Sequence, residues 1–202
     1  MKRKISLLLV LVMAVTVFAG CKKNNANNND TNNTTDSTTG NVSQQAPESA
    51  LQILQNVWNA YGENEKFPII GGNLENPVDN APGDFNMDHV EGLTGNLVIP
   101  ADQLAKVKSA ALMIHMMNAN TFTAGAVQLD NGENAADFAK TMQEALQNNR
   151  WICGTPEKLL IATFDGNYVL VAFGVSQTLD TFRSKLAEVY PGVSIAYAEN
   201  IA

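Results

Sequence analysis

Cysteine is scarce in this chain, which contains only Cys21 and Cys153. Small exported domains that cannot build a sufficient core are usually stabilised by several disulfides. Two cysteines give at most one disulfide, and none remains if Cys21 serves another purpose. The sequence therefore predicts a domain that is stabilised by an ordinary hydrophobic core.

Positive charge is also scarce. The chain has 13 Lys and Arg residues against 20 Asp and Glu residues, and its formal net charge is −7 at pH 7. Proteins that bind nucleic acid need a basic patch to neutralise phosphates. The composition therefore argues against nucleic acid as a partner, and against a domain that lies directly on an anionic membrane surface.

The usual sequence signatures of catalysis and cofactor binding are missing. The chain has no His-Glu-X-X-His zinc motif, no Gly-X-Ser-X-Gly nucleophile turn and no glycine-rich phosphate loop. Each of these motifs places its reacting groups at a fixed spacing, so their absence removes the common hydrolases and nucleotide-binding enzymes. The sequence predicts a protein that is not an enzyme and carries no cofactor.

Only one long apolar run is present, from Ile5 to Phe18, and it follows the positive residues 2–4. The run is too short to span a bilayer comfortably, and it has the order of a secretory signal peptide. We therefore expect residues 1–20 to be a signal peptide. Because no second run follows, we expect no transmembrane helix in the rest of the chain.

The end of this segment, Phe18-Ala19-Gly20-Cys21, resembles the lipobox of bacterial lipoproteins. In that family the cysteine sulfur receives a diacylglycerol, and the signal peptide is cut just before the cysteine. Phe18 stands where the family usually has leucine. The resemblance implies a lipid on Cys21, a membrane partner for that lipid, and a position on the outer face of a cell membrane. The alternative is an ordinary secretory signal with an incidental cysteine.

The next residues predict a tether. In residues 22–45, which are rich in Asn and Thr, the only aliphatic side chains are Ala26 and Val42. Such a segment cannot bury enough apolar surface to offset the entropy lost on ordering. We therefore expect residues 21–45 to be a lipidated cysteine with a disordered tether, and residues 46–202 to be a single α+β domain.

The first half of this domain predicts a helical and loop-rich extension. Leu51, Leu54 and Trp58 have helical spacing within 47–61, and Pro47 suits the first turn. Turn residues dominate 62–100, where short extended pieces are expected at 67–70 and 95–99. An apolar stripe then predicts a buried helix over 101–118.

The second half has a regular alternation of patterns. Asp165-Gly166 joins two apolar runs and is a strong hairpin signal. Asn134 is placed to begin a helix. The order β-α-β-β-α-β over 121–198 predicts a ferredoxin-like sheet whose first and third strands are central. The expected elements are strands at 121–129, 158–164, 168–173 and 193–197, and helices that begin at Asn134 and cover 179–189.

The segment from Met113 to Gly174 resembles a group of clostridial surface lipoproteins that carry a domain of unknown function. The shared features are a Met-rich helix before an Ala-rich strand, an amphipathic helix that ends near Asn149-Arg150, and the strand start Gly166-Asn167-Tyr168. The resemblance implies a lipoprotein of the Gram-positive type. It brings no activity and no catalytic residue.

One polar cluster is a candidate site. It lies in the 79–91 loop, and its candidate metal ligands are Asp84, Asp88 and His89. Carboxylate oxygens suit calcium, and a histidine adds zinc or manganese. The spacing matches no EF-hand. The alternative is a solvated acidic loop that contains helix caps. The cluster is completed by Asp79 and Glu91.

Sulfur offers two further candidates. Cys153 has the chemistry of a nucleophile with His89 or His115 as its base, but a lone cysteine is more typically a small buried hydrophobe. The methionines at 113, 116 and 117 have the chemistry to line an adaptable groove or bind soft copper, but core filling is the more common role.

The preferred hypothesis is a non-enzymatic surface lipoprotein whose domain binds an envelope protein or a small ligand. The first alternative is an envelope-associated, metal-dependent hydrolase that uses the 79–91 loop, and it requires Asp84, Asp88 and His89 to converge in a cleft. The second alternative is a structural subunit of an envelope complex, which requires an exposed apolar patch.

Overall fold

The computed structural model of the chain describes residues 47–202. The predicted signal peptide, the lipidation of Cys21 and the predicted tether lie outside the described residues. In chain order, the helices and strands are α1 (Ala50–Asn59), β1 (Ile69–Asn73), β2 (Asn76–Asp79), β3 (Gly83–Asp84), η1 (Met87–His89), α2 (Gly92–Leu97), η2 (Ala101–Lys106), β4 (Val107–His115), β5 (Phe122–Leu129), α3 (Ala135–Gln147), β6 (Lys158–Phe164), β7 (Tyr168–Gly174), α4 (Ser176–Val189) and β8 (Ser194–Asn200).

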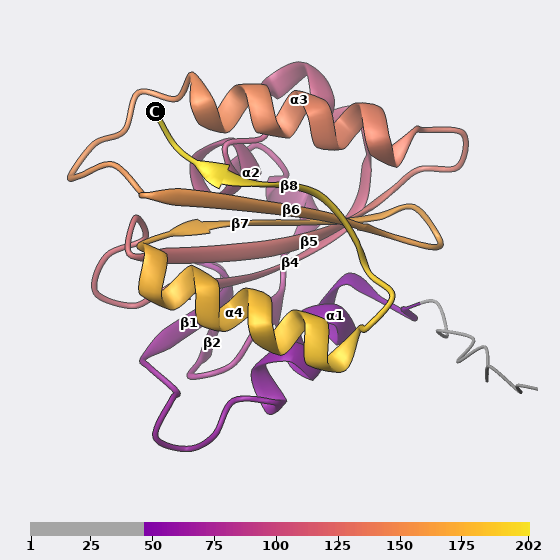
Figure 1. The fold of residues 1–202 in the computed structure, drawn as a ribbon. Coiled ribbons are helices and arrows are strands. Elements are labelled where there is room, and N and C mark those ends of the chain that lie inside the picture. Colours follow the sequence, from indigo (N-terminus) through magenta and orange to yellow (C-terminus); the bar gives the residue numbers. More distant parts are fainter. Residues whose placement is uncertain (1–46) are drawn as a thin grey trace, which may run out of the picture. The chain divides into compact units, whose positions relative to one another are not determined.

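An eight-stranded sheet runs through the middle of the domain, in the order β2-β1-β4-β5-β7-β6-β8 with β3 paired to β4. Every pairing between neighbours is antiparallel. Helices α1 and α4 cover one face, and α2 and α3 cover the other (Figure 1). The prediction of a mixed α and β domain is therefore confirmed.

Each face of the sheet has its own hydrophobic core. On the face of α1 and α4, Phe122 is fully buried, with ring centroids 5.3 Å from Phe67 and 5.2 Å from Phe182. On the opposite face, Phe138 and Met142 of α3 pack against β6 and β7. Large side chains buried in this way each stabilise the fold by about 1.5–3 kcal/mol. The sheet is therefore packed on both of its faces.

The elements after residue 121 confirm most of their predictions. Asn134 caps α3, since its side-chain oxygen accepts hydrogen bonds from the N–H groups of Ala136 and Asp137. The β6–β7 hairpin forms at the predicted Asp165-Gly166, with Phe164 paired to Tyr168. Gly166 and Asn167 in its turn both have positive φ, at 81° and 62°. Glycine and asparagine tolerate this conformation best, which explains why the turn forms here.

The predicted helix over 101–118 is wrong. Its first turn is the short 3₁₀ helix η2, but residues 107–115 form β4, which lies between β5 on one side and β1 and β3 on the other. Ala111 and Met113 point into one core, whereas Ala110 and Leu112 point into the other. A strand buried on both faces is continuously apolar, and such a run has the same appearance as a buried helix.

The first half of the domain is not an extension, because β1 to β4 complete the same sheet. Helix α1 begins after Ser49, whose hydroxyl accepts from the N–H of Gln52, and not at Pro47. The strand expected at 67–70 is found only in part, because β1 begins at Ile69 and runs on to Asn73. The one expected at 95–99 is wrong, because 92–97 form α2.

The ferredoxin-like arrangement over 121–198 is not confirmed. As predicted, β5 and β7 are neighbours inside the sheet. However, the last strand, β8, pairs with β6 and lies at the edge of the sheet. Strand β4 occupies the outer edge of β5, so that edge is not free to accept β8.

Candidate functional site

The structure does not gather the predicted acidic cluster. Asp79, Asp84 and Asp88 are exposed, and they lie on β2, β3 and η1 respectively. His89 and Glu91 approach each other, with 3.7 Å between Nδ1 and Oε1. Within residues 47–202, no group of three or more His, Cys, Asp and Glu side chains is placed to hold a metal ion. The convergence required by the hydrolase alternative is therefore not found in this range.

His89 and Glu91 nevertheless line a pocket of about 270 Å³. The tip of the β1–β2 hairpin, residues 73–75, forms one wall, and Phe85 lies beside it. Helix α2 forms another wall through Gly92, Gly95 and Asn96. Asp84 and Asp88 are not among the lining residues. We call this cavity the hairpin pocket.

A crossing of two chain segments positions the hairpin. Strand β1 pairs with β4 only as far as Gly71, which lies opposite Met113. From Leu112 onward, β3 pairs with the same edge of β4 in place of β1. The backbones cross so closely at Gly71 that a Cβ atom there would overlap Ala81, Pro82 and Gly83. The close approach therefore requires glycine. It directs the β1–β2 hairpin away from β4 and toward α2.

Asn73 is the unusual residue of the pocket. It ends β1, pairs with Asn76 across the turn, and is only 9% exposed. Neither its Oδ1 nor its Nδ2 atom has a hydrogen-bond partner among the described residues. A buried polar group without a partner costs about 1–3 kcal/mol, and such groups are rare in native proteins. Asn73 therefore offers an acceptor and two donors that the fold leaves unused.

The charges around the pocket restrict what it can bind. Glu75 and Glu91 contribute carboxylates, His89 contributes an imidazole, and no Lys or Arg lines the cavity. Carboxylates accept hydrogen bonds and repel anions. The pocket therefore favours a neutral or positively charged molecule that carries hydroxyl or amino groups.

Sequence reasoning missed Asn73. In the sequence, Asn73 stands next to Gly71-Gly72 and before Glu75, in a composition that is typical of a solvated turn. Nothing local distinguishes an asparagine that the fold buries from one that stays in solvent. His89 and Glu91 were found because histidine near carboxylates is itself a recognisable signal.

The other sequence candidates lie elsewhere. The expected burial of Cys153 is wrong: the residue is exposed in a loop, with φ at 66°. His115 is half-buried at the end of β4, where its Nδ1 accepts a hydrogen bond from the N–H of Met117 and its ring stacks on Phe67.

The methionines do not share one role. Met113 is fully buried in a core, but Met116 is 47% exposed and Met117 is 82% exposed. A helix would have placed all three on one face. Because β4 is a strand that ends at His115, the two later methionines leave the sheet.

None of the helices within residues 47–202 is long and apolar enough to cross a bilayer. The comparisons with known proteins add no relative: no protein-family model, no curated protein and no solved structure matches the chain.

Proposed function

We propose that this chain is a lipid-anchored lipoprotein on the outer face of a cell membrane, of the Gram-positive type, and that its domain binds a small polar ligand in the hairpin pocket. The lipobox-like sequence at Cys21 and the polar segment behind it support the anchored position. The acidic composition supports partners other than nucleic acid. The activity is binding without catalysis.

The unpartnered carboxamide of Asn73 carries this proposal. Folding free energy is small, so a polar group that weakens the fold is usually retained for another purpose. Because both polar atoms of Asn73 are covered, a ligand that enters the hairpin pocket supplies the missing hydrogen bonds once the atoms that cover the carboxamide move aside. The carboxylates of Glu75 and Glu91 then accept from further hydroxyl or amino groups.

The ligand is small and polar. A volume of about 270 Å³ is close to the lower end of ligand-binding cavities. The negative side chains and the absence of Lys and Arg from the lining select a polyol, a simple sugar or a small amine. Glucosamine, N-acetylglucosamine and putrescine are suitable probes because they separate the hydroxyl contribution from the amino contribution.

Filling the pocket tests its role. Gly95 lines the pocket, and a Cβ atom there meets nothing within 4 Å, so Gly95→Gln adds a side chain to the pocket wall with no clash at its first atom. Glutamine also favours a helix over glycine by roughly 0.5–1 kcal/mol. We expect Gly95→Gln to weaken binding of the best probe at least tenfold, measured by calorimetry on the full-length chain in detergent, without a loss of thermal stability.

Thr94→Gln is the matched control, because Thr94 is exposed on the same helix and does not line the pocket. It should bind as the wild type does. The proposed function is wrong if none of the three probes binds the wild type, or if both variants bind equally.

The anchor is tested separately at Cys21. If this sulfur carries the lipid, cells fed a palmitate analogue should label the chain, and Cys21→Ser should remove the label and release the protein from the membrane fraction. Cys153→Ser is the control and should change neither result. Labelling that persists in Cys21→Ser contradicts the anchor, whatever the outcome of the ligand experiments.

A further inference from the structure

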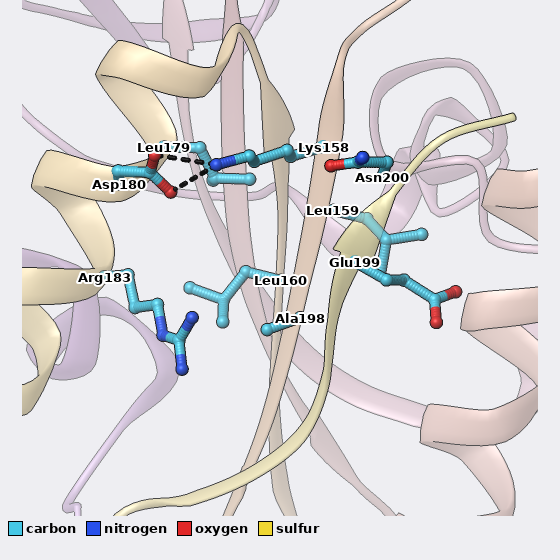
Figure 2. A pocket seen from close by; sticks show the side chains of 9 residues that line it. All are labelled: Lys158, Leu159, Leu160, Leu179, Asp180, Arg183, Ala198, Glu199 and Asn200. Carbon is cyan, nitrogen blue, oxygen red and sulfur yellow. Dashed lines mark hydrogen bonds and ion pairs between the residues drawn. The ribbon is translucent and has the colours of Figure 1, made fainter.

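A second pocket lies at the opposite edge of the sheet from the β1–β2 hairpin, between α4 and the edge strand β8. Its volume is about 220 Å³, and Figure 2 shows the side chains that line it. Leu160 of β6 and Leu179 of α4, which are 1% and 3% exposed, form an apolar floor. The small side chain of Ala198 on β8 leaves the space above this floor open. We call this cavity the edge pocket.

Two of the charges at the edge pocket neutralise each other. Lys158 Nζ lies 2.9 Å and 2.7 Å from the two carboxylate oxygens of Asp180 (Figure 2). Glu199 points to the other side of β8, where Gln143 and Gln147 of α3 donate hydrogen bonds to its carboxylate. Both carboxylates therefore already accept hydrogen bonds from groups within the protein.

Arg183 remains as the unpaired charge. It lies one helical turn beyond Asp180 on α4, and its guanidinium group borders the pocket (Figure 2). It takes part in no ion pair among the described residues, whereas Lys158 pairs with Asp180. The four charged residues that line the pocket balance in formal charge, but Arg183, which is exposed, has no ion-pair partner among the described residues and lies beside an apolar floor.

We infer that the edge pocket binds a small organic carboxylate. The planar guanidinium of Arg183 matches a carboxylate with two parallel hydrogen bonds. The short aliphatic part of the ligand lies on Leu160, Leu179 and Ala198, and the Asn200 side chain at the rim offers a further polar contact. A single arginine without an ion-pair partner fits a monocarboxylate better than a phosphate dianion, which needs more than one cation.

This site is independent of the proposed function, because the two pockets offer different groups to a ligand. The lining of the hairpin pocket has carboxylates and no Lys or Arg, whereas the edge pocket also has Arg183, which forms no ion pair among the described residues. Strands β1 and β8 lie toward opposite edges of the sheet. The two pockets therefore do not need one ligand that carries both an amino group and a carboxylate.

Arginine labelling gives a direct test. The arginines of the chain are Arg3, Arg150 and Arg183, so the full-length protein labelled with ¹⁵N-arginine in detergent gives a simple spectrum. Butyrate is the probe, and sodium chloride at equal ionic strength is the reference. We expect the Nε–H signal of Arg183 to shift saturably with butyrate, while the Arg150 signal stays in place.

Substitutions separate recognition from general charge. Arg183→Gln should weaken butyrate binding at least tenfold, and Arg183→Lys should also weaken it, because an ammonium group lacks the paired donors. Arg150→Gln removes the same charge elsewhere and should leave binding unchanged. The inference is overturned if sodium chloride moves the Arg183 signal as butyrate does, if inorganic phosphate binds more tightly than butyrate, or if both glutamine variants behave alike.

Discussion

Replacing Asn73 by leucine is expected to stabilise the fold and to abolish ligand binding in the hairpin pocket. The variant removes two buried polar atoms that have no partner among the described residues and adds apolar surface at a position that is only 9% exposed. Removing an unsatisfied buried group recovers about 1–3 kcal/mol in the free energy of unfolding. For a domain of this size, each kcal/mol raises the Tm by about 2–4 °C.

The same variant should lose the thermal response to ligand. A molecule that binds only the folded state stabilises it by mass action, so glucosamine should raise the Tm of the wild type and not that of Asn73→Leu. Thermal scans of the full-length chain with and without the probe measure both effects together. If Asn73→Leu unfolds at a lower temperature than the wild type, the carboxamide of Asn73 already has hydrogen-bond partners in the folded protein.

Asn76→Leu is the matched control for this experiment. Asn76 pairs with Asn73 across the same turn, but it is exposed and does not line the pocket. Its replacement should change the free energy of unfolding by less than about 0.5 kcal/mol, as surface substitutions usually do. It should also leave the response to the probe intact.

Gly71→Ala is expected to destabilise the domain by about 3 kcal/mol or more. The added Cβ atom would overlap backbone atoms of Ala81, Pro82 and Gly83. A flexible side chain can move aside, but a crossing backbone segment cannot move without breaking its pairing with β4. Urea unfolding of the full-length chain measures the loss, and the hairpin pocket should lose its probe affinity as well.

Gly95→Ala is the natural comparison, since the same substitution there meets nothing within 4 Å and lies in a helix. We expect it to stabilise the domain by up to about 1 kcal/mol, because alanine favours a helix over glycine. If Gly71→Ala and Gly95→Ala changed the free energy of unfolding equally, the two backbone segments would not cross as closely at Gly71 as the structure shows.

The sequence predicted the second half of the domain well because its signals are local. The Asn134 cap, the turn at Asp165-Gly166 and the helical spacing around Leu186 each act within a few residues. Each of these signals depends only on the backbone conformation and on residues close in sequence. The packing of the whole domain favours the same local structures. The elements from β5 to β8 therefore lie close to their predicted bounds.

The strand order could not be predicted, because it depends on β4. Residues 107–115 are apolar on both faces, and this pattern was interpreted as a helix. Because the prediction placed a helix at these residues, it left the edge of β5 free for the last strand and gave a ferredoxin-like strand order. In the structure β4 occupies that edge, so β8 pairs with β6.

The candidate sites depend on still longer-range relations. Asn73 becomes a candidate only because the folded chain buries its carboxamide without a partner among the described residues, and Arg183 only because the fold places it beside the edge pocket. Neither relation is visible as a spacing in the sequence. His89 and Glu91 were predicted as part of the 79–91 cluster, but the metal-ligand set that included Asp84 and Asp88 does not come together.

The side-chain amide signal of Asn73 gives the most direct test of the hairpin pocket. In the full-length chain labelled with ¹⁵N-asparagine, the Asn73→Leu variant identifies this Nδ2 signal by its absence. The proposed function predicts that glucosamine, N-acetylglucosamine or putrescine shifts the signal saturably in the wild type and not in Gly95→Gln. A signal that none of the three probes moves would contradict the assignment of this pocket as the ligand site.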